Sequence, residues 1–157
     1  MTLAPRLLPL VLALAVAATA AAQTRIGEVS TTFRVVGPND KVVVERFDDP
    51  KVANVACWIS RADTGGVKGG LGLAEDPARF GIACAATGQP RITGEIGRDK
   101  KGEVVFDERA SALFKKVRVT RFLDAERNAL VYLVWSTITV TTEGSPYNAV
   151  AVIPLAP

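Results

Sequence analysis

Residues 113–140, LFKKVRVTRFLDAERNALVYLVWSTITV, consist of two runs rich in β-branched and aromatic residues with a polar segment between them. Such runs favour strands, and the polar segment around residues 124–128 favours the turn of a hairpin. We expect Val117 and Val119 to face the core opposite Trp135 and Leu133. This assignment depends on the register, because a slip of one residue exchanges the two faces of a strand.

Extended patterns of the same kind recur along most of the chain. The segment Val52–Ser60 is one of them, and alternation places Val55, Cys57 and Ile59 on a common face. The other candidate strands are residues 26–36, 41–47, 82–87, 103–106 and 148–155. One short helix is expected from Asp76 to Phe80, because Asp-Pro is typical of a helix start. The sequence therefore predicts a single, mainly β, antiparallel domain, either a sandwich or a partly open barrel.

The first 22 residues are typical of a secretory signal peptide. Arg6 is followed by an uncharged run of 16 residues, Leu7–Ala22, which ends in small residues. Cleavage after Ala22 fits this pattern, and so does cleavage after Ala20. The run is shorter than the roughly 20 apolar residues of a membrane-spanning helix. We therefore expect a periplasmic domain of residues 23–157 with no stable membrane anchor.

Histidine is absent from the chain. Catalysis by Ser-His-Asp or Cys-His is thereby excluded, together with zinc sites that use imidazole. Cys57 and Cys84 are too few for a thiolate metal site and do not form a C-x-x-C motif. In an oxidising compartment such a pair most simply forms a structural disulfide. The alternative is two buried free thiols. We expect neither a metal nor a cofactor.

The charge of the chain gives little support to a nucleic-acid partner. The formal net charge is +3, and the loss of Arg6 with the signal peptide leaves 18 basic against 16 acidic residues, or +2. Basic and acidic residues are interleaved along most of the chain, whereas nucleic-acid binding requires a concentrated basic surface. We expect no nucleic-acid binding.

The most unusual segment is TGGVKGGLGLAED, residues 64–76, which contains five glycines. It does not match the P-loop, because Lys68 precedes the second glycine pair instead of following it, and it does not match G-x-G-x-x-G. Two interpretations remain open. The segment is either a tight bend packed over the sheet, or a nest of backbone amides that binds an anionic or carbonyl ligand, with Lys68 as the counter-charge.

The second interpretation defines a candidate ligand site on and beside this segment. Its residues are Arg61, Gly65, Gly66, Lys68, Gly69, Gly70, Glu75 and Asp76. A competing hypothesis is a hydrolase or transferase, which requires Asp48, Asp49 or Asp107 to converge with Glu75 and Asp76 in one pocket. A third is a purely structural protein of the cell envelope. No catalytic machinery is visible in the sequence, so we do not expect an enzyme.

Several segments resemble the CreA family. They are FDDP, CWISRADTGGVKGGLGLAED, GEVVF, FKKVRVTRF, DAERNALVYL and EGSP, and the resemblance spans about Ile26 to Pro154. It implies a small secreted protein of Gram-negative bacteria, linked by association to catabolite regulation and sensor systems, with both cysteines at the family's positions. It implies no catalytic residue. The chain departs from the family pattern between Trp135 and Glu143, so a partner surface there is not carried over.

These observations together predict a periplasmic accessory or binding protein. Its partner is expected to be a small molecule or a protein of the envelope. The glycine-rich segment is expected to be its recognition surface.

Overall fold

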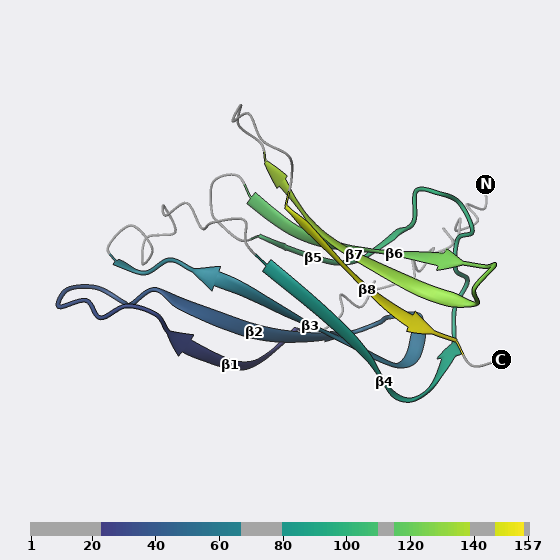
Figure 1. Ribbon diagram of the computed structural model, residues 1–157, viewed down its shortest axis with the longest axis horizontal. Coiled ribbons are helices and arrows are strands. Elements are labelled where there is room, and N and C mark those ends of the chain that lie inside the picture. Colours follow the sequence, from purple (N-terminus) through teal and green to yellow (C-terminus); the bar gives the residue numbers. More distant parts are fainter. Residues whose placement is uncertain (1–22, 67–79, 110–114, 139–146, 156–157) are drawn as a thin grey trace, which may run out of the picture.

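The computed structural model describes residues 23–66, 80–109, 115–138 and 147–155. These residues form two four-stranded antiparallel sheets that face each other, with orders β1-β2-β3-β4 and β5-β6-β7-β8 (Figure 1). The strands are β1 (Thr24–Ser30), β2 (Lys41–Asp48), β3 (Val52–Asp63), β4 (Phe80–Ile92), β5 (Glu103–Arg109), β6 (Lys115–Asp124), β7 (Ala129–Ile138) and β8 (Asn148–Pro154). The prediction of a mainly β, antiparallel domain is confirmed. The expected helix lies outside the described residues, apart from Phe80, which begins β4.

The hairpin of β6 and β7 has a different register from the one predicted. Val117 and Val119 are buried as expected, but they pair with Ser136 and Val134 instead of Trp135 and Leu133. The two strands are joined by the four residues 125–128, one more than the predicted register requires. The core face of β7 is therefore formed by Leu130, Tyr132, Val134 and Ser136.

β4 is longer than its sequence pattern predicts. It pairs with β3 over Phe80–Ala86 and again at Arg91 and Ile92, with a β-bulge between Ala53 and Val55. Asn54 occupies this bulge in the left-handed region, with φ of 64°, a conformation that asparagine tolerates better than most residues. Its side-chain amide donates to the Gln89 carbonyl oxygen at 2.9 Å. Pairing with β3 thus extends the strand past Gly88, where the local sequence alone favours a break.

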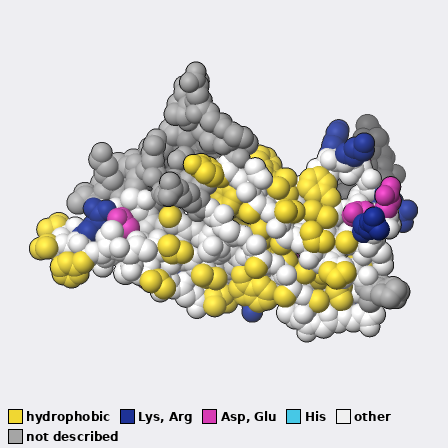
Figure 2. Space-filling model, in the orientation of Figure 1, with side chains coloured by type: hydrophobic (Ala, Val, Ile, Leu, Met, Phe, Trp, Pro, Cys, Tyr) yellow, Lys and Arg dark blue, Asp and Glu magenta, His cyan; other side chains and the backbone are white. Residues whose placement is uncertain are grey.

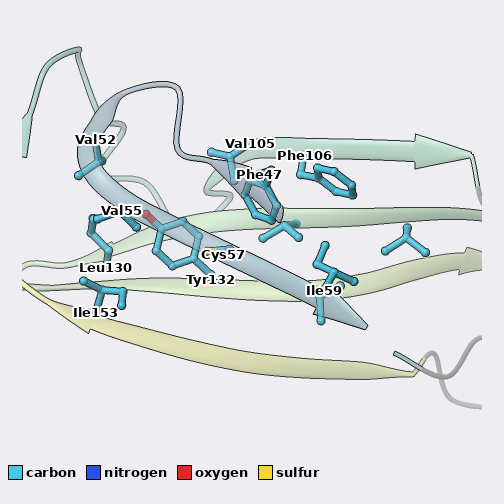
Figure 3. Close-up of a cluster of buried hydrophobic side chains, with 13 residues drawn as sticks. Phe47, Val52, Val55, Cys57, Ile59, Val105, Phe106, Leu130, Tyr132 and Ile153 are labelled. Carbon is cyan, nitrogen blue, oxygen red and sulfur yellow. The ribbon is translucent and has the colours of Figure 1, made fainter. Parts of the chain in front are cut away.

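The hydrophobic core lies between the two sheets (Figure 3). Val55, Cys57 and Ile59 share the buried face of β3, as predicted. The aromatic rings of Phe47 and Phe106 stack across the sheets, with centroids 4.8 Å apart. The remaining members of the core are Val52, Val105, Val117, Val119, Leu130, Tyr132, Val134 and Ile153.

The strands at the sheet edges differ in how they are covered. β4 and β8 lie side by side, although each pairs within its own sheet.

On the face seen in Figure 2, charged side chains gather towards the two ends, and the middle is hydrophobic or neutral. Among the described strands β1 pairs with β2 alone, and all seven of its residues are exposed. The described residues contain no helix with the length and hydropathy that a membrane crossing requires.

Candidate functional site

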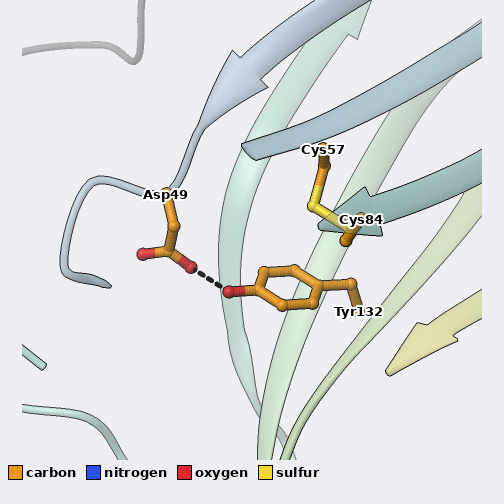
Figure 4. The surroundings of a disulfide bond; sticks show 4 residues. All are labelled: Asp49, Cys57, Cys84 and Tyr132. Atoms are coloured by element: carbon orange, nitrogen blue, oxygen red, sulfur yellow. Dashed lines mark hydrogen bonds between the residues drawn. A yellow bond between two sulfur atoms is a disulfide. The ribbon is translucent and has the colours of Figure 1, made fainter. Parts of the chain in front are cut away.

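Cys57 and Cys84 form a disulfide bond within the first sheet. The two residues are direct partners on β3 and β4, with Cα atoms 4.0 Å apart. The bond lies beside the ring of Tyr132 (Figure 4). The disulfide that the sequence predicts is confirmed, and it joins the two strands from which residues 64–79 depart and to which they return.

The start of the glycine-rich segment is bound to the loop between β1 and β2. The Gly65 amide donates to the Asp40 carboxylate at 2.8 Å, and the Gly66 amide donates to the Pro38 carbonyl oxygen at 2.6 Å. The guanidinium of Arg34 donates to both oxygens of Asp40, at 2.9 and 2.7 Å. We call the end of the sandwich where β3 ends at Asp63 and β4 begins at Phe80 the loop end.

Glycine is required at both of these positions. A Cβ atom on Gly65 would lie 2.1 Å from the Pro38 carbonyl oxygen, closer than any real contact. Gly66 has φ of 76°, a conformation that side chains disfavour. A residue with a side chain at either position would disturb the hydrogen bonds that the two amides make within the protein.

The other candidate ligand residues of this segment, Lys68, Gly69, Gly70, Glu75 and Asp76, lie outside the described residues. The ligand site therefore stays a prediction.

Replacement of Gly65 by alanine is expected to detach this segment from the β1–β2 loop. The added Cβ would collide with the backbone of Pro38 and Asn39, and such overpacking costs about 1–3 kcal/mol of unfolding free energy. Urea unfolding measures this loss. Gly97→Ala is the matched control, because a Cβ there meets nothing within 4 Å, and it should change stability by less than about 0.5 kcal/mol. Equal effects of the two substitutions would argue against the observed docking.

The same contact predicts a titration at acid pH. Hydrogen bonds from Arg34 and from the Gly65 amide hold the pKa of the Asp40 carboxyl below its ordinary value of 3.8. A lowered pKa means that the contact contributes stability at and above the ordinary value, and loses it as the pH falls through the lowered value. The Gly65 amide resonance should therefore shift with a midpoint below pH 3.8, as followed by NMR. Asp40→Asn should abolish this shift, and a midpoint above 3.8 would contradict the assignment.

Arg61, predicted as a ligand residue, belongs to a charged group that joins the two sheets at the loop end. Its guanidinium donates to both oxygens of Glu45 on β2, at 3.0 and 3.2 Å, and to Glu108 on β5 at 3.1 Å. The side chains of Arg61 and Glu45 are only 14% and 9% exposed. Burial raises the pKa of Glu108, and the nearby charge of Glu45 adds to this effect while Arg61 opposes it.

A second set of charges continues this surface towards β1. Arg25 and Lys41 each contact both Glu28 and Asp63, at 3.2–3.7 Å. Two positive and two negative side chains therefore form a closed and balanced ring. The ring lies on β1 and the adjoining ends of β2 and β3, where the residues of β1 are all exposed.

The opposite end of the sandwich holds a buried charged group that sequence reasoning missed. Asp49 forms an ion pair with Arg121, and both side chains are fully buried. The Tyr132 hydroxyl donates to Asp49 at 2.7 Å, and Arg121 also contacts Glu103 at 2.7 Å. Burial raises the pKa of Tyr132, and the charge of Asp49 raises it further. This arrangement fixes the side chains of Asp49, Arg121 and Tyr132 in the core.

The carboxylates proposed for catalysis occupy separate places. Asp49 is buried against Arg121, whereas Asp107 pairs with Arg118 at 3.0 Å on the outer face of the second sheet. Asp48 is exposed and lies 3.8 Å from Arg46. Their proposed partners Glu75 and Asp76 lie outside the described residues. In the part of the chain that the structure describes, no three acidic or cysteine residues could hold a metal together.

Comparison with known proteins places the chain in a family. The sequence model described as CreA protein matches residues 26–157. The chain belongs to the CreA family. Protein CreA of Escherichia coli (strain K12) is 52% identical over 133 residues, which cover 84% of this chain and 83% of the relative. Protein CreA of Escherichia coli O157:H7 matches with the same identity and coverage. No solved structure matches the chain.

The loop end of this CreA protein therefore combines three features. They are the anchored start of the glycine-rich segment, the ion pairs of Arg61 with Glu45 and Glu108, and the ring of Arg25, Lys41, Glu28 and Asp63. The sequence predicts Arg61, Gly65 and Gly66 as ligand residues, and this role stays a prediction. Glu45 and Glu108, which contact Arg61, were not predicted. The signal for Glu45 was present, because alternation places it on the same face of β2 as the buried Val43 and Phe47.

Proposed function

We propose that this CreA protein is a periplasmic accessory protein that binds an anionic or carbonyl-bearing ligand, or an envelope protein, at the loop end. The recognition surface is residues 64–76 together with Arg61. The observation that supports it is the hydrogen bond from the Gly65 amide to the Asp40 carboxylate. In this contact the first glycine amide of the glycine-rich segment already binds an anionic oxygen, which is the chemistry required of the amides that follow.

The proposed location has separate support. Residues 1–22 have the sequence of a signal peptide. The Cys57–Cys84 disulfide agrees with an oxidising compartment, where such bonds persist. Spheroplast fractionation of a Gram-negative host that produces the full chain tests this part of the proposal, and recovery with the cytoplasmic fraction would contradict it.

The binding proposal is tested by thermal shift of the mature domain. Inorganic phosphate, carboxylic acids, divalent cations and glycan fragments serve as probes. A probe at 100 times its dissociation constant should stabilise the wild type by about 2.7 kcal/mol. The shift should be lost in Lys68→Ala/Gly69→Ala. The matched control is Lys100→Ala/Gly97→Ala, which removes one lysine and one glycine from an exposed turn elsewhere.

The outcomes separate the hypotheses. A shift lost only in the first variant supports a ligand site on the glycine-rich segment. A shift retained in both variants places the ligand elsewhere. No shift with any probe, from variants that still fold, argues against small-molecule binding and leaves an envelope protein as the partner.

A further inference from the structure

Gln23 contacts the charged group at the loop end. Its side-chain amide donates to Glu108 at 3.1 Å, while the other oxygen of Glu108 accepts from Arg61 at 3.1 Å. Gln23 directly precedes β1 of the first sheet, whereas Glu108 lies on β5 of the second. The contact therefore brings the start of the described chain to a carboxylate between the sheets.

The two cleavage sites that the sequence leaves open give different chain starts. Cleavage after Ala22 makes Gln23 the first residue, and cleavage after Ala20 leaves Ala21 first. We propose that the mature chain begins at Gln23 and that its new α-ammonium group binds the Glu108 carboxylate. This inference rests on the proposed export of the protein. The contact of the Gln23 side-chain amide with Glu108 keeps the α-nitrogen within about the length of one glutamine side chain of this carboxylate.

The charges around Glu108 favour an additional cation. Glu45 and Glu108 share one guanidinium, that of Arg61. The neighbouring ring cannot contribute, because its two positive and two negative side chains balance each other. Among the side chains that the structure describes, this group of three therefore has one negative charge in excess. Burial is the largest cause that raises the pKa of Glu108, Glu45 adds to it, and the charge of Arg61 offsets it only in part. An α-ammonium group would supply the positive charge that balances this excess.

The pairing has a defined pH range. An α-amino group ordinarily has a pKa of about 7.7–8.0. Pairing with a carboxylate raises this value in the folded state, so the stabilisation is complete below about pH 7.7 and is lost as the pH rises through the raised value. On the acid side it ends when Glu108 becomes protonated. Among the described side chains, Arg61 and Glu45 are the other charged groups that face Glu108. The neighbouring ring consists of Arg25, Lys41, Glu28 and Asp63.

The first experiment determines the start of the chain. The full chain is produced with its own leader in a Gram-negative host, and the intact mass of the periplasmic protein is measured. A chain that begins at Gln23 with a free amine is the expected result. A start at Ala21 would overturn the inference and leave the binding proposal intact. An uncleaved chain in the cytoplasm would overturn the proposed export as well.

The second experiment tests the bond itself. Chains that begin at Gln23 and at Ala21 are compared, each with Glu108 and with Glu108→Gln. At pH 7 the Gln23 start should raise the folding equilibrium constant about threefold to fivefold over the Ala21 start, as for a partly exposed ion pair. This ratio should fall to about one in Glu108→Gln and in the wild type above about pH 10. Asp107→Asn, on the outer face of the same strand, should leave the ratio unchanged. Equal stabilities of the two wild-type chains would overturn the inference.

A chemical readout adds independent evidence. The free α-amine of an N-terminal glutamine attacks its own side-chain carbonyl carbon, which closes a lactam ring and releases the amide nitrogen as ammonia. The α-ammonium group bound by Glu108 is protonated and has no lone pair with which to attack. Mass spectrometry should therefore find at least twofold slower loss of ammonia in the wild type than in Glu108→Gln. Equal rates, or a lactam already formed in freshly isolated protein, would contradict the proposed bond.

Discussion

Replacement of Arg121 by methionine is expected to lower the free energy of unfolding by about 3–5 kcal/mol. The substitution keeps an unbranched side chain of similar length but removes the cation. Asp49 would then be a fully buried carboxylate that retains the Tyr132 hydroxyl and the Lys51 amide as hydrogen-bond donors. An unpaired buried charge is costly because the core cannot replace the solvation that water provides in the unfolded chain.

Denaturant unfolding of a small set of variants separates this effect from simple loss of packing. The double substitution Asp49→Asn/Arg121→Met should cost less than the sum of the single ones, because it leaves no buried charge. Asp107→Asn breaks the exposed pair with Arg118 and should change stability by less than about 1 kcal/mol. If Arg121→Met behaves like this exposed control, the assigned role of the buried pair is wrong.

Removal of the disulfide by Cys57→Ala/Cys84→Ala should lower the free energy of unfolding by about 2–5 kcal/mol. The bond closes a segment with a sequence separation of 27, for which the chain-entropy model gives roughly 3–4 kcal/mol. The buried position of Cys57, which is 1% exposed, adds a small loss of packing when its sulfur is removed.

Reduction provides the control for this prediction. Dithiothreitol present during unfolding should lower the midpoint of the wild type to near that of the double variant. The variant itself should not respond to the reductant. A wild-type midpoint that is unchanged after complete reduction, verified by thiol titration, would contradict a stabilising role for the bond.

The strands could be predicted from the sequence, whereas the register of β6 and β7 could not. Val117 and Val119 alternate with polar residues, so their face is unambiguous. β7 is apolar along almost its whole length, and alternation cannot distinguish Leu130, Tyr132 and Val134 from the residues between them. The length of the turn decides the register, and one residue there reverses every side chain of the strand. Asn128, with φ of 48°, provides the left-handed conformation that this longer turn uses.

The candidate site could be predicted only where it is local in sequence. Gly65 and Gly66 stand out because a glycine cluster indicates unusual backbone geometry. The ion pairs depend on contacts between distant segments: Arg61 and Glu108 are 47 positions apart, and Asp49 and Arg121 are 72 apart. One signal was available in the sequence. Alternation places Arg121, two residues after Val119, on a face predicted to be buried, and a charged residue there indicates a buried ion pair.

The topology also determines what can form first. The chain completes the sheet of β1 to β4 by Ile92 before it begins the sheet of β5 to β8 at Glu103. Each ladder between the described strands joins neighbours along the chain, and the disulfide lies wholly within the first sheet. A chain that emerges from its amino-terminal end can therefore pair its first four strands and close the disulfide while the second half is still absent. The ion pairs Asp49–Arg121 and Arg61–Glu108 would then form as the later half docks, and they hold the two halves together at opposite ends.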